Sequence, residues 1–559
     1  MVIRREGNTH HQYFHNDSGV LDIISRNDHL KNELQITVSQ QNFGLLISME
    51  TDFPVVVTPV AEDPLLKTTR IGEVTEVKVT TAFRFKTGKE THIRFKRVFL
   101  ESIRAIRIYQ EGGDGNYLKY AEKYNEKGVS IESHGNLLEL KRNYQNILNY
   151  RAILSFPEEI ILEKNNHHFI LPEGEYLVPV SIFLSGFFKT EDFSIYTKNP
   201  LEMLAPRLQL EYKTLTRDEQ KLVNNNLSGL SILAGASKLM AGGPRFFTYF
   251  GRDTLITLSL LVGKVEKKII INGLRSVLAR LSEKGEVAHE ETIGEYAHLL
   301  YAGDSKIIPD SHMEYQMVDD DFLLPLTVSR CLELGFKKDL AELLESRFAN
   351  GESGYELLVK NIKFCSNQLA GGLIPYHRDV PVGDWRDSLA FQGIHYSYEL
   401  NRGLAPYLKD VILTLKEDFP ACSESMADYE RDYSKFQMGL SQYYVSERIE
   451  DIHVYLNDWL SKTGFSFNER NILMSRVNIK EEKQYPFFTM ALDKAFEPIK
   501  IQHNDMAFSM LYGFPEIEEL DIMLIPLETF FPLGLKTGVG ILVSNPCFAK
   551  DLRVRFDLN

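Results

Sequence analysis

Residues 77–95 read VKVTTAFRFKTGKETHIRF. Apolar side chains recur at every second position on both sides of Thr87-Gly88-Lys89, for example at Phe85 and Ile93. Successive side chains of a β-strand point to opposite faces, so this alternation predicts strands that each bury one face. A short break that contains glycine between two such runs is typical of an antiparallel hairpin. We therefore expect a strand, a turn and a second strand paired with the first.

The same alternation continues over residues 30–200, with further strand-like runs at 151–156 and 176–188. A polar stretch near residues 117–149 interrupts it and has a helix-friendly composition. Antiparallel strands with one apolar face bury that face most readily between two sheets. The sequence therefore predicts an N-terminal antiparallel β-sandwich over residues 1–205, with a partly helical insertion near residues 117–149.

The apolar spacing changes to that of helices after Pro206. Thr216-Arg217-Asp218-Glu219 has the pattern of a helix-capping box, and apolar residues follow it at helical spacing, as they do over residues 274–281. Residues 206–559 have room for roughly a dozen helices of average length, and no short repeat indicates a solenoid. Helical spacing alone is compatible with a bundle, an irregular packing or a barrel of paired helices.

The composition excludes several classes of protein. With 43% hydrophobic and 25% charged residues among 559, the chain is of the packed globular type. Its net charge of −14 argues against nucleic acid and anionic membranes as partners. The four cysteines form no C-x-x-C pair, so we expect neither a zinc site nor a disulfide framework. Since we find no membrane-spanning run and no signal-peptide core, we expect a soluble, cytoplasmic protein.

Residues 247–254, FTYFGRDT, form the first candidate site. Asp253 beside Arg252 has an ordinary explanation, namely an acidic side chain at a helix N-terminus with a basic partner. A guanidinium and a carboxylate side by side also suit sugar hydroxyls, which both donate and accept hydrogen bonds. Aromatic rings such as that of Phe250 would add an apolar platform. Taken alone, the segment supports either interpretation.

A second candidate segment, HEETIGE at residues 289–295, is similar to the H-E-x-x-H signature of zinc proteases. Position 293 is isoleucine where that signature needs a second histidine, so the metal site is excluded. The three carboxylates would share one turn of a helix. A solvated helix face explains Glu295 best, whereas His289 and Glu290 stay candidates for ligand binding.

A third segment contains the acidic run Asp319-Asp320-Asp321, directly before the apolar residues 322–326. Adjacent acids suggest calcium, but the spaced ligands of a calcium-binding loop are missing. Helix capping or substrate binding is therefore favoured over a metal, and Asp319 is the preferred binding residue of the three.

The fourth segment is VGDWRDS at residues 382–388, after the Gly- and Pro-containing residues 371–377. It holds Trp385, one of only two tryptophans in the chain, beside Arg386 and two aspartates. A surface loop seldom exposes a tryptophan to solvent without a function, so we favour a functional site here. The sequence has no Walker loop, no G-x-G-x-x-G and no G-x-S-x-G motif, so we expect neither an organic cofactor nor a serine hydrolase.

Together these segments resemble the glucosidase domain of glycogen debranching enzymes and, more distantly, the glucoamylases, in the superfamily of (α/α)6 six-hairpin glycosidases. Residues 250–254 resemble the family's aromatic-Gly-Arg-Asp-Thr segment, and residues 315–322 its Tyr-x-x-Val-Asp segment. Trp385-Arg386-Asp387 is similar to its Trp-Met-Asp, and residues 399–401 to its Glu-Ile-Asn. By motif the resemblance covers residues 240–402, in the family's order.

The resemblance implies an (α/α)6 barrel over residues 206–559 and exo-acting α-glucosidase chemistry. It assigns the general acid to Asp387. The residues that we expect to contact the substrate are Phe250, Arg252, Asp253, His289, Glu290, Asp319, Trp385, Arg386 and Glu399. Arg386 replaces the family's methionine. Because an inward guanidinium would lower the pKa of Asp387, we predict that Arg386 faces the substrate or a different acid.

Inverting hydrolysis of a glycoside also needs a carboxylate that activates water, roughly 6.5–9.5 Å from the acid. The resemblance places this base late in the chain, where the candidates are Asp505, Glu528 and Glu497, and we prefer Asp505 and then Glu528. The predicted function is the release of glucose from α-glucans such as glycogen or starch, without a metal or an organic cofactor. A phosphorylase on the same fold and a non-catalytic glycan-binding protein are the alternatives.

Overall fold

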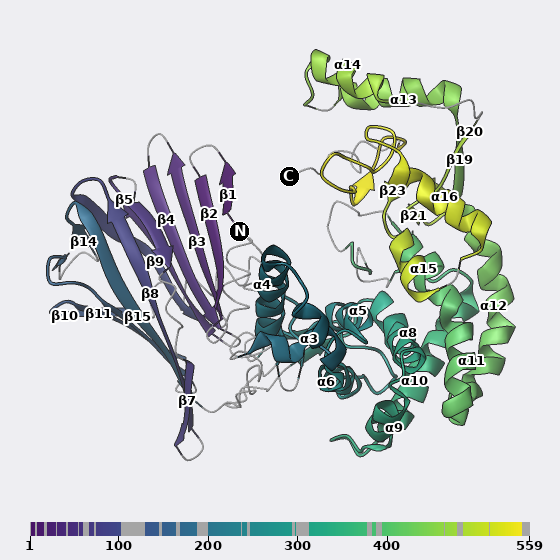
Figure 1. Ribbon diagram of the computed structural model, residues 1–559, viewed down its shortest axis with the longest axis horizontal. Helices are drawn as coiled ribbons and strands as arrows, with labels where there is room; N and C mark the ends of the chain where they lie inside the picture. The colour runs from purple at the N-terminus through teal and green to yellow at the C-terminus, as the bar shows by residue number, and fades with distance from the viewer. Residues whose placement is uncertain are drawn as a thin grey trace. The chain divides into compact units, whose positions relative to one another are not determined.

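The computed structural model has a sheet-rich N-terminal part and a mainly helical C-terminal part (Figure 1). The residues that it describes are 2–5, 8–15, 19–28, 31–40, 43–53, 55–59, 66–71, 74–101, 129–144, 148–163, 168–186, 199–235, 238–242, 246, 248–292, 297, 312–376, 383–386, 394–462, 464–477, 484–513 and 515–549. The chain divides into two compact units. The first comprises Met1–Thr254, Gly263–Gly273 and Glu290–Glu314, and the second comprises Leu255–Val262, Leu274–His289 and Tyr315–Asn559.

Two antiparallel sheets make up most of the first unit. The first sheet has the strand order β1 (Val2–Arg5), β2 (Asn8–His15), β3 (Gly19–Asp28), β4 (Lys31–Gln40), β5 (Phe43–Thr51), β9 (Thr91–Glu101), β14 (His168–Leu171) and β13 (Ile161–Glu163). The second has the order β10 (Ser130–His134), β11 (Leu137–Tyr144), β12 (Leu148–Ser155), β15 (Gly174–Gly186), β8 (Val74–Thr87) and β6 (Val55–Pro59), and β7 (Leu66–Ile71) also pairs with β8.

The hairpin predicted for residues 77–95 is wrong, although both of its strands are present. β8 pairs with β15, with Phe83 opposite Val178, whereas β9 pairs with β5 and β14 in the other sheet. The turn between them is held by the Thr87 hydroxyl, which donates to the Lys89 carbonyl oxygen and lies 2.7 Å from the Thr91 hydroxyl. Alternation defines which face of a strand is apolar, but the neighbouring strand is chosen by tertiary packing.

The helical insertion predicted near residues 117–149 is also wrong where the chain is described. Residues 130–134 and 137–144 form β10 and β11, and β11 pairs with β12 over its whole length. Leu138, Leu140 and Tyr144 are buried in this strand. Their one-sided burial overrides the polar composition of the stretch. Residues 117–128 lie outside the described residues.

Apolar side chains of both sheets meet in one core. Phe169 of β14, in the first sheet, packs on Phe85 of β8, in the second, with ring centroids 6.4 Å apart. Phe95 and Phe156 contact the same ring at 5.5 and 4.9 Å. Because buried apolar area stabilises a fold by about 25 cal/mol per Å², this shared core holds the two sheets together.

Beyond residue 199 the described chain is mainly helical. The α-helices are α3 (Pro206–Tyr212), α4 (Arg217–Leu233), α5 (Gly251–Leu261), α6 (Lys267–Leu278), α8 (Asp319–Glu333), α9 (Lys337–Glu345), α10 (Gly354–Gln368), α11 (Leu408–Asp418), α12 (Met426–Leu440), α13 (Ile449–Ser461), α14 (Phe467–Ser475), α15 (Met506–Tyr512) and α16 (Ile517–Glu528). The 3₁₀-helices are η1 (Pro200–Met203), η2 (Leu369–Gly371), η5 (Ala405–Tyr407), η6 (Pro420–Ser425) and η7 (Ser441–Tyr443), and η4 (Glu399–Leu404) is a π-helix.

Short strands connect some of these helices. They are β16 (Glu290–Thr292), β17 (His312–Glu314), β18 (Tyr396–Ser397), β19 (Tyr444–Arg448), β20 (Gln484–Phe488), β21 (Ala491–Leu492), β22 (Pro498–Ile499), β23 (Gln502–His503) and β24 (Ser544–Asn545). Among the described residues, every helix is too short or too polar to traverse a lipid bilayer.

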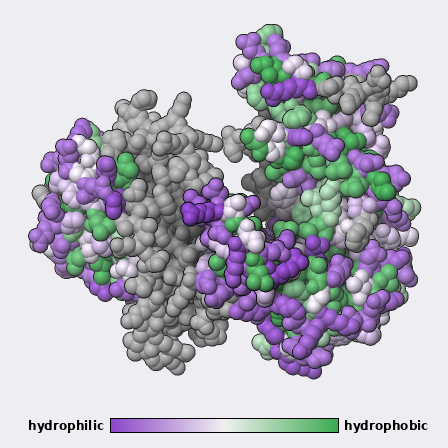
Figure 2. Space-filling model, viewed as in Figure 1, coloured by the Kyte–Doolittle hydropathy of each residue, from purple (hydrophilic) through white to green (hydrophobic). Residues whose placement is uncertain are grey.

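The helices follow the local signals of the sequence. The predicted capping box of α4 is confirmed, because the Thr216 backbone N–H donates to the Glu219 carboxylate at 2.8 Å and the Glu219 N–H donates to the Thr216 hydroxyl. In α9 the side chains at helical spacing, Leu340, Leu343 and Leu344, are buried. Figure 2 shows a largely hydrophilic surface where α9 lies, as expected for a helix with one apolar face.

Phe169→Ala tests the shared core of the two sheets. We expect the variant to lose about 3–5 kcal/mol of unfolding free energy, because it removes a ring that contacts side chains of both sheets. Urea unfolding followed by circular dichroism measures this loss. Val56→Ala serves as the control, since Val56 lies in β6 and is 58% exposed. Equal losses in the two variants would contradict the assignment of the core.

Candidate active site

Trp385 and Arg386 are anchored by the buried carboxylate of Asp505. The Arg386 side chain donates two hydrogen bonds to it, from Nε to Oδ2 at 3.0 Å and from Nη2 to Oδ1 at 2.7 Å. The Trp385 indole Nε1 donates to the same Oδ1 at 3.1 Å. Arg386 is 4% and Asp505 1% exposed. The prediction that Arg386 faces the substrate or a different acid is thus met by a bidentate ion pair with Asp505, which fixes position and orientation together.

Further contacts complete this anchor. Nη2 of Arg386 also donates to the Val543 carbonyl oxygen at 3.0 Å, and the Arg386 backbone N–H donates to Asp384 at 2.9 Å. The guanidinium carbon lies 4.4 Å from the Trp385 ring centroid, within the range of a cation–π contact. Arg386 and Asp505 are 119 positions apart, so the ion pair ties the loop before residue 387 to the residue before α15.

The Asp505 carboxylate accepts three side-chain hydrogen bonds, out of about four that its lone pairs allow. Oδ1 accepts from Trp385 and Arg386, and Oδ2 accepts from Arg386. His503 Nδ1 lies 3.3 Å from Oδ2 and accepts a hydrogen bond from the Asp505 backbone N–H at 3.1 Å. Burial alone raises the pKa of Asp505, but the Arg386 guanidinium and His503 outweigh it and lower the pKa to about 2. This geometry favours a positioning role for Asp505, and its role as the base stays a prediction.

The anchored loop is joined to the predicted Asp319 site. The Val318 backbone N–H donates to the Gly383 carbonyl oxygen at 3.0 Å. Asp319, the next residue, begins α8 and is fully buried. This bond therefore places residues 383–386 beside residues 315–322, and both stretches belong to segments that the sequence marked as candidate sites.

The first turn of α8 carries three buried carboxylates, Asp319, Asp320 and Asp321. His289 Nδ1 lies 3.0 Å from Asp320 Oδ2, and the Val287 backbone N–H donates to Asp321 at 2.6 Å. Burial raises the pKa of Asp321 well above its usual range in spite of this hydrogen bond, and the neighbouring carboxylates raise it further. His289 thus contacts the acidic first turn of α8 at Asp320. The sequence did not predict this pairing.

Glu399 is buried in the same compact unit, at the start of η4. The ring of the preceding Tyr398 packs on His503 with centroids 4.6 Å apart. Burial raises the pKa of Tyr376 well above its usual range, and the negative charges of Asp384 and Glu399 raise it further. Both carboxylates are therefore close enough to Tyr376 to act on its hydroxyl. Asp384 is 1% exposed, and the sequence marked it only as one of the two aspartates beside Trp385, without a role.

Phe250, Arg252, Asp253 and Glu290 belong to the other compact unit. Phe250 and Glu290 form an isolated β-bridge. Arg252 is buried in the first turn of α5, whereas Asp253 is exposed. Neighbouring side chains of a helix project about 100° apart, which explains this difference. The two groups of the predicted sugar grip therefore have different surroundings.

The prediction that Glu290 and Glu291 share a helical turn is wrong. Both lie in β16, which pairs with β17, so their side chains point to opposite faces of a strand. Glu291 forms a buried ion pair with Lys238 at 2.7 Å, with side chains 3% and 7% exposed. No motif marked Lys238, and only the tertiary structure identifies this pair. Glu295 lies outside the described residues.

The other predicted catalytic residues lie in different surroundings. Glu528, at the end of α16, and Glu497, before β22, are both exposed. Asp387, the predicted general acid, lies outside the described residues and directly follows Arg386 in the chain. Six of the predicted residues lie in the second compact unit and are buried or partly buried. They are His289, Asp319, Trp385, Arg386, Glu399 and Asp505.

One group of described side chains in the first unit has the composition of a metal site. Ligand atoms of Glu132, His134 and Glu139 lie within 4.8 Å of one another. The Lys141 ammonium lies 2.7 Å from Glu139 and 3.2 Å from Glu132, and Arg151 also pairs with Glu139. These cations balance the carboxylates, so we assign no metal to this group.

No family model and no curated protein matches the sequence. The chain does resemble solved structures. A bacterial glucoamylase complexed with acarbose has a TM-score of 0.43 at 9% identity, over 95% of this chain and 79% of that one. A putative kojibiose phosphorylase from the human microbiome has a TM-score of 0.29 at 9% identity, over 78% and 68% of the two chains. An α-L-rhamnosidase from Dictyoglumus thermophilum has 0.27 at 10%, over 80% and 60%.

Identities and TM-scores at this level assign neither a family nor an activity to the chain.

Asp505→Asn tests the buried anchor by its effect on stability. Breaking a buried ion pair leaves one charge uncompensated, so we expect a loss of about 3–5 kcal/mol at pH 7. The pKa of Asp505 is about 2 in the folded chain, against about 3.9 when unfolded. The contribution of the ionised group is therefore complete above about pH 5 and is lost as the pH falls towards 2.

Urea unfolding of the wild-type protein and of Asp505→Asn between pH 7 and pH 3 measures this pH-dependent contribution to stability. Asp432→Asn is the control, because Asp432 pairs with its sequence neighbour Arg431, whose side chain is 61% exposed, and this pair should contribute little. A stability difference for Asp505→Asn that stays constant as the pH falls would contradict the account.

Proposed function

We propose that the protein is a glycoside hydrolase that releases glucose from the non-reducing ends of α-glucans such as glycogen or starch, with inversion. One observation carries the proposal: Trp385 and Arg386 are bonded to Asp505, and Gly383 of the same stretch accepts a hydrogen bond from Val318, the residue before α8. Two glycosidase-like segments distant in sequence thus meet in a buried cluster rich in carboxylates. We further propose that the strands close as a β-sandwich and that the helices complete an (α/α)6 barrel around this cluster.

The general acid in this proposal is Asp387. Hydrolysis passes through an oxocarbenium-like state and needs a protonated carboxyl at the leaving oxygen. Asp387 follows Arg386 directly, and an unopposed guanidinium there would favour the ionised form of the acid. The bidentate pairing with Asp505 compensates that charge. Asp505 therefore acts as a positioning residue that also permits Asp387 to hold its proton near neutral pH.

The carboxylate that activates water must have an oxygen available for that water. The contacts of Asp505 argue against it, since its oxygens already accept from Trp385 and Arg386. We propose Glu399 in its place, because Glu399 is fully buried in the same compact unit as Arg386 and Asp505. Glu528 and Glu497 are exposed and less suited to this task.

The substrate contacts in this proposal come from motif residues of the second compact unit. Asp319 and Trp385 would bind the terminal sugar from the carboxylate-rich cluster. The hydroxyl groups of a sugar need hydrogen-bond acceptors, which carboxylates supply. Trp385 would add apolar surface for the sugar ring.

Incubation with glycogen, maltotriose and isomaltose, with and without phosphate, tests the proposed reaction. We expect glucose without phosphate, with the β-anomer first in proton NMR because the mechanism inverts. Asp387→Asn should reduce turnover by a factor of about 10³ or more while substrate binding persists, with Asp432→Asn as an active control. Turnover that requires phosphate would support a phosphorylase, and binding of all three glucans without turnover would contradict an enzyme.

The pH dependence of turnover separates the two roles considered for Asp505. If Asp505 is a positioning residue, the Asp505→Asn substitution leaves the Arg386 charge uncompensated. That charge lowers the pKa of Asp387. The alkaline limb of the kcat profile should then move to lower pH by about one unit. Asp505→Glu should restore the profile. Loss of turnover at every pH in Asp505→Asn, with a normal profile and full activity in Glu399→Gln, would instead identify Asp505 as the base.

A further inference from the structure

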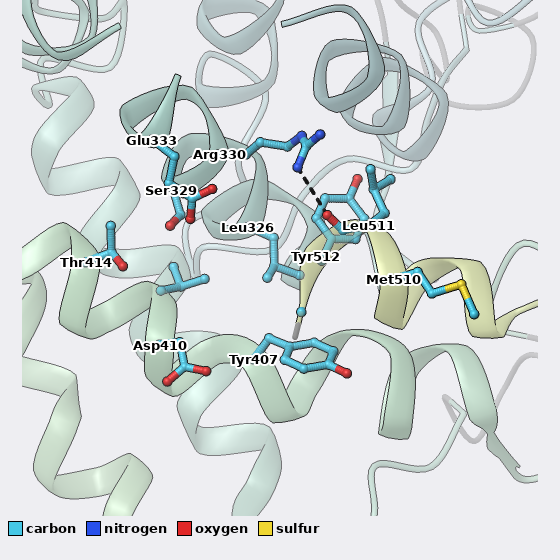
Figure 3. Close-up of a pocket in the computed structure, with 12 residues that line it drawn as sticks. Leu326, Ser329, Arg330, Glu333, Tyr407, Asp410, Thr414, Met510, Leu511 and Tyr512 are labelled. Carbon is cyan, nitrogen blue, oxygen red and sulfur yellow. Dashed lines mark hydrogen bonds between the residues drawn. The ribbon is translucent and has the colours of Figure 1, made fainter. Parts of the chain in front are cut away.

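A pocket of about 350 Å³ lies within the second unit, at the C-terminal half of α8 (Figure 3). Residues of α8, η5, α11 and α15 line it. Arg330 in its wall is on the order of 16 Å along the helix axis from Asp319, at about 1.5 Å of rise per residue. The described residues of the candidate active site are absent from its lining. The pocket is therefore a separate cavity on the same helix.

Two kinds of side chain border this pocket (Figure 3). On one side lie the carboxylates of Glu333, from α8, and Asp410, from α11, with the hydroxyls of Ser329 and Thr414 close by. The rings of Tyr407 and Tyr512 lie on the other side, together with apolar side chains of α8 and α15. The walls thus combine hydrogen-bond acceptors, hydroxyl groups and aromatic surface.

This mixture suits a ligand with many hydroxyls better than an ion. Carboxylates only accept hydrogen bonds, whereas serine, threonine and tyrosine hydroxyls both donate and accept. An ammonium ligand only donates and so could not accept from the hydroxyl groups, and an anion would be repelled by Glu333 and Asp410. The nearby Arg330 is tied to the carbonyl oxygens of Ser259 and Leu511, so it balances charge in the wall.

We propose that this pocket binds a neutral mono- or disaccharide. Sugar hydroxyls would pair with Asp410, Glu333 and Thr414, and the C–H face of the ring would lie on a tyrosine. The volume is at the small end of ligand pockets, which favours one or two sugar rings over a branched polymer. The choice of a sugar rests on the proposed function, whose product, glucose, would be released from a site on the same unit.

Methyl NMR of the full-length protein labelled at methionine tests this directly. Met510 lines the pocket and is 37% exposed, so its methyl group can report on an occupant. Met510→Leu assigns its resonance. Titration with glucose and with maltose should move this resonance saturably. Asp410→Ala should raise the half-saturating concentration about tenfold or more, since it removes hydrogen bonds to a charged group.

Lys409→Ala, at the neighbouring exposed position of α11, is the matched control and should leave the titration unchanged. Turnover should be unaffected in both α11 variants. A saturable response in a protein that hydrolyses no glucan would support the pocket and remove the proposed function. An unmoved Met510 resonance at high sugar concentration, or a response equal in Asp410→Ala and wild type, would overturn the proposal while leaving the catalytic site untouched.

Discussion

The buried ion pair between Arg386 and Asp505 is the interaction on which the candidate active site depends. It joins positions 119 residues apart, and both side chains are almost fully removed from water. Desolvation of two charges is unfavourable, and only good geometry with further hydrogen bonds offsets it. Trp385 and the Val543 carbonyl provide those bonds here. Residues 383–386 are therefore tied to the residue before α15.

α8 links this anchor to the rest of the second unit. Its first residue, Asp319, follows the Val318 N–H that bonds to the anchored loop, and its first turn holds three buried acids. Its C-terminal half lines the pocket in which we place a second sugar. The acidic first turn and the pocket therefore belong to one helix, with Pro325 between them.

Local signals in the sequence predicted local structure well. Alternation identified the strands around Phe85 and Ile93, and the Thr216 capping box marked the start of α4. Four segments with unusual polar residues pointed to a carbohydrate site, and two of them meet in the second unit. Contacts between residues far apart in the sequence could not be predicted. Neither the alternation nor the spacing of apolar residues determines which strand pairs with which, or which charged side chains form an ion pair. The sheet change between β8 and β9 is one case, and the Lys238–Glu291 and Arg386–Asp505 pairs are others.

A double-mutant cycle for unfolding free energy, with Arg386→Met, Asp505→Leu and the double variant, tests the central claim most directly. Each single variant leaves a buried charge without its partner, whereas the double variant removes both charges. We predict a double variant more stable than either single one, with a coupling energy of about 2 kcal/mol or more. If the losses of the two single variants sum to the loss of the double variant within about 0.5 kcal/mol, the two side chains do not depend on each other. That result would contradict the account.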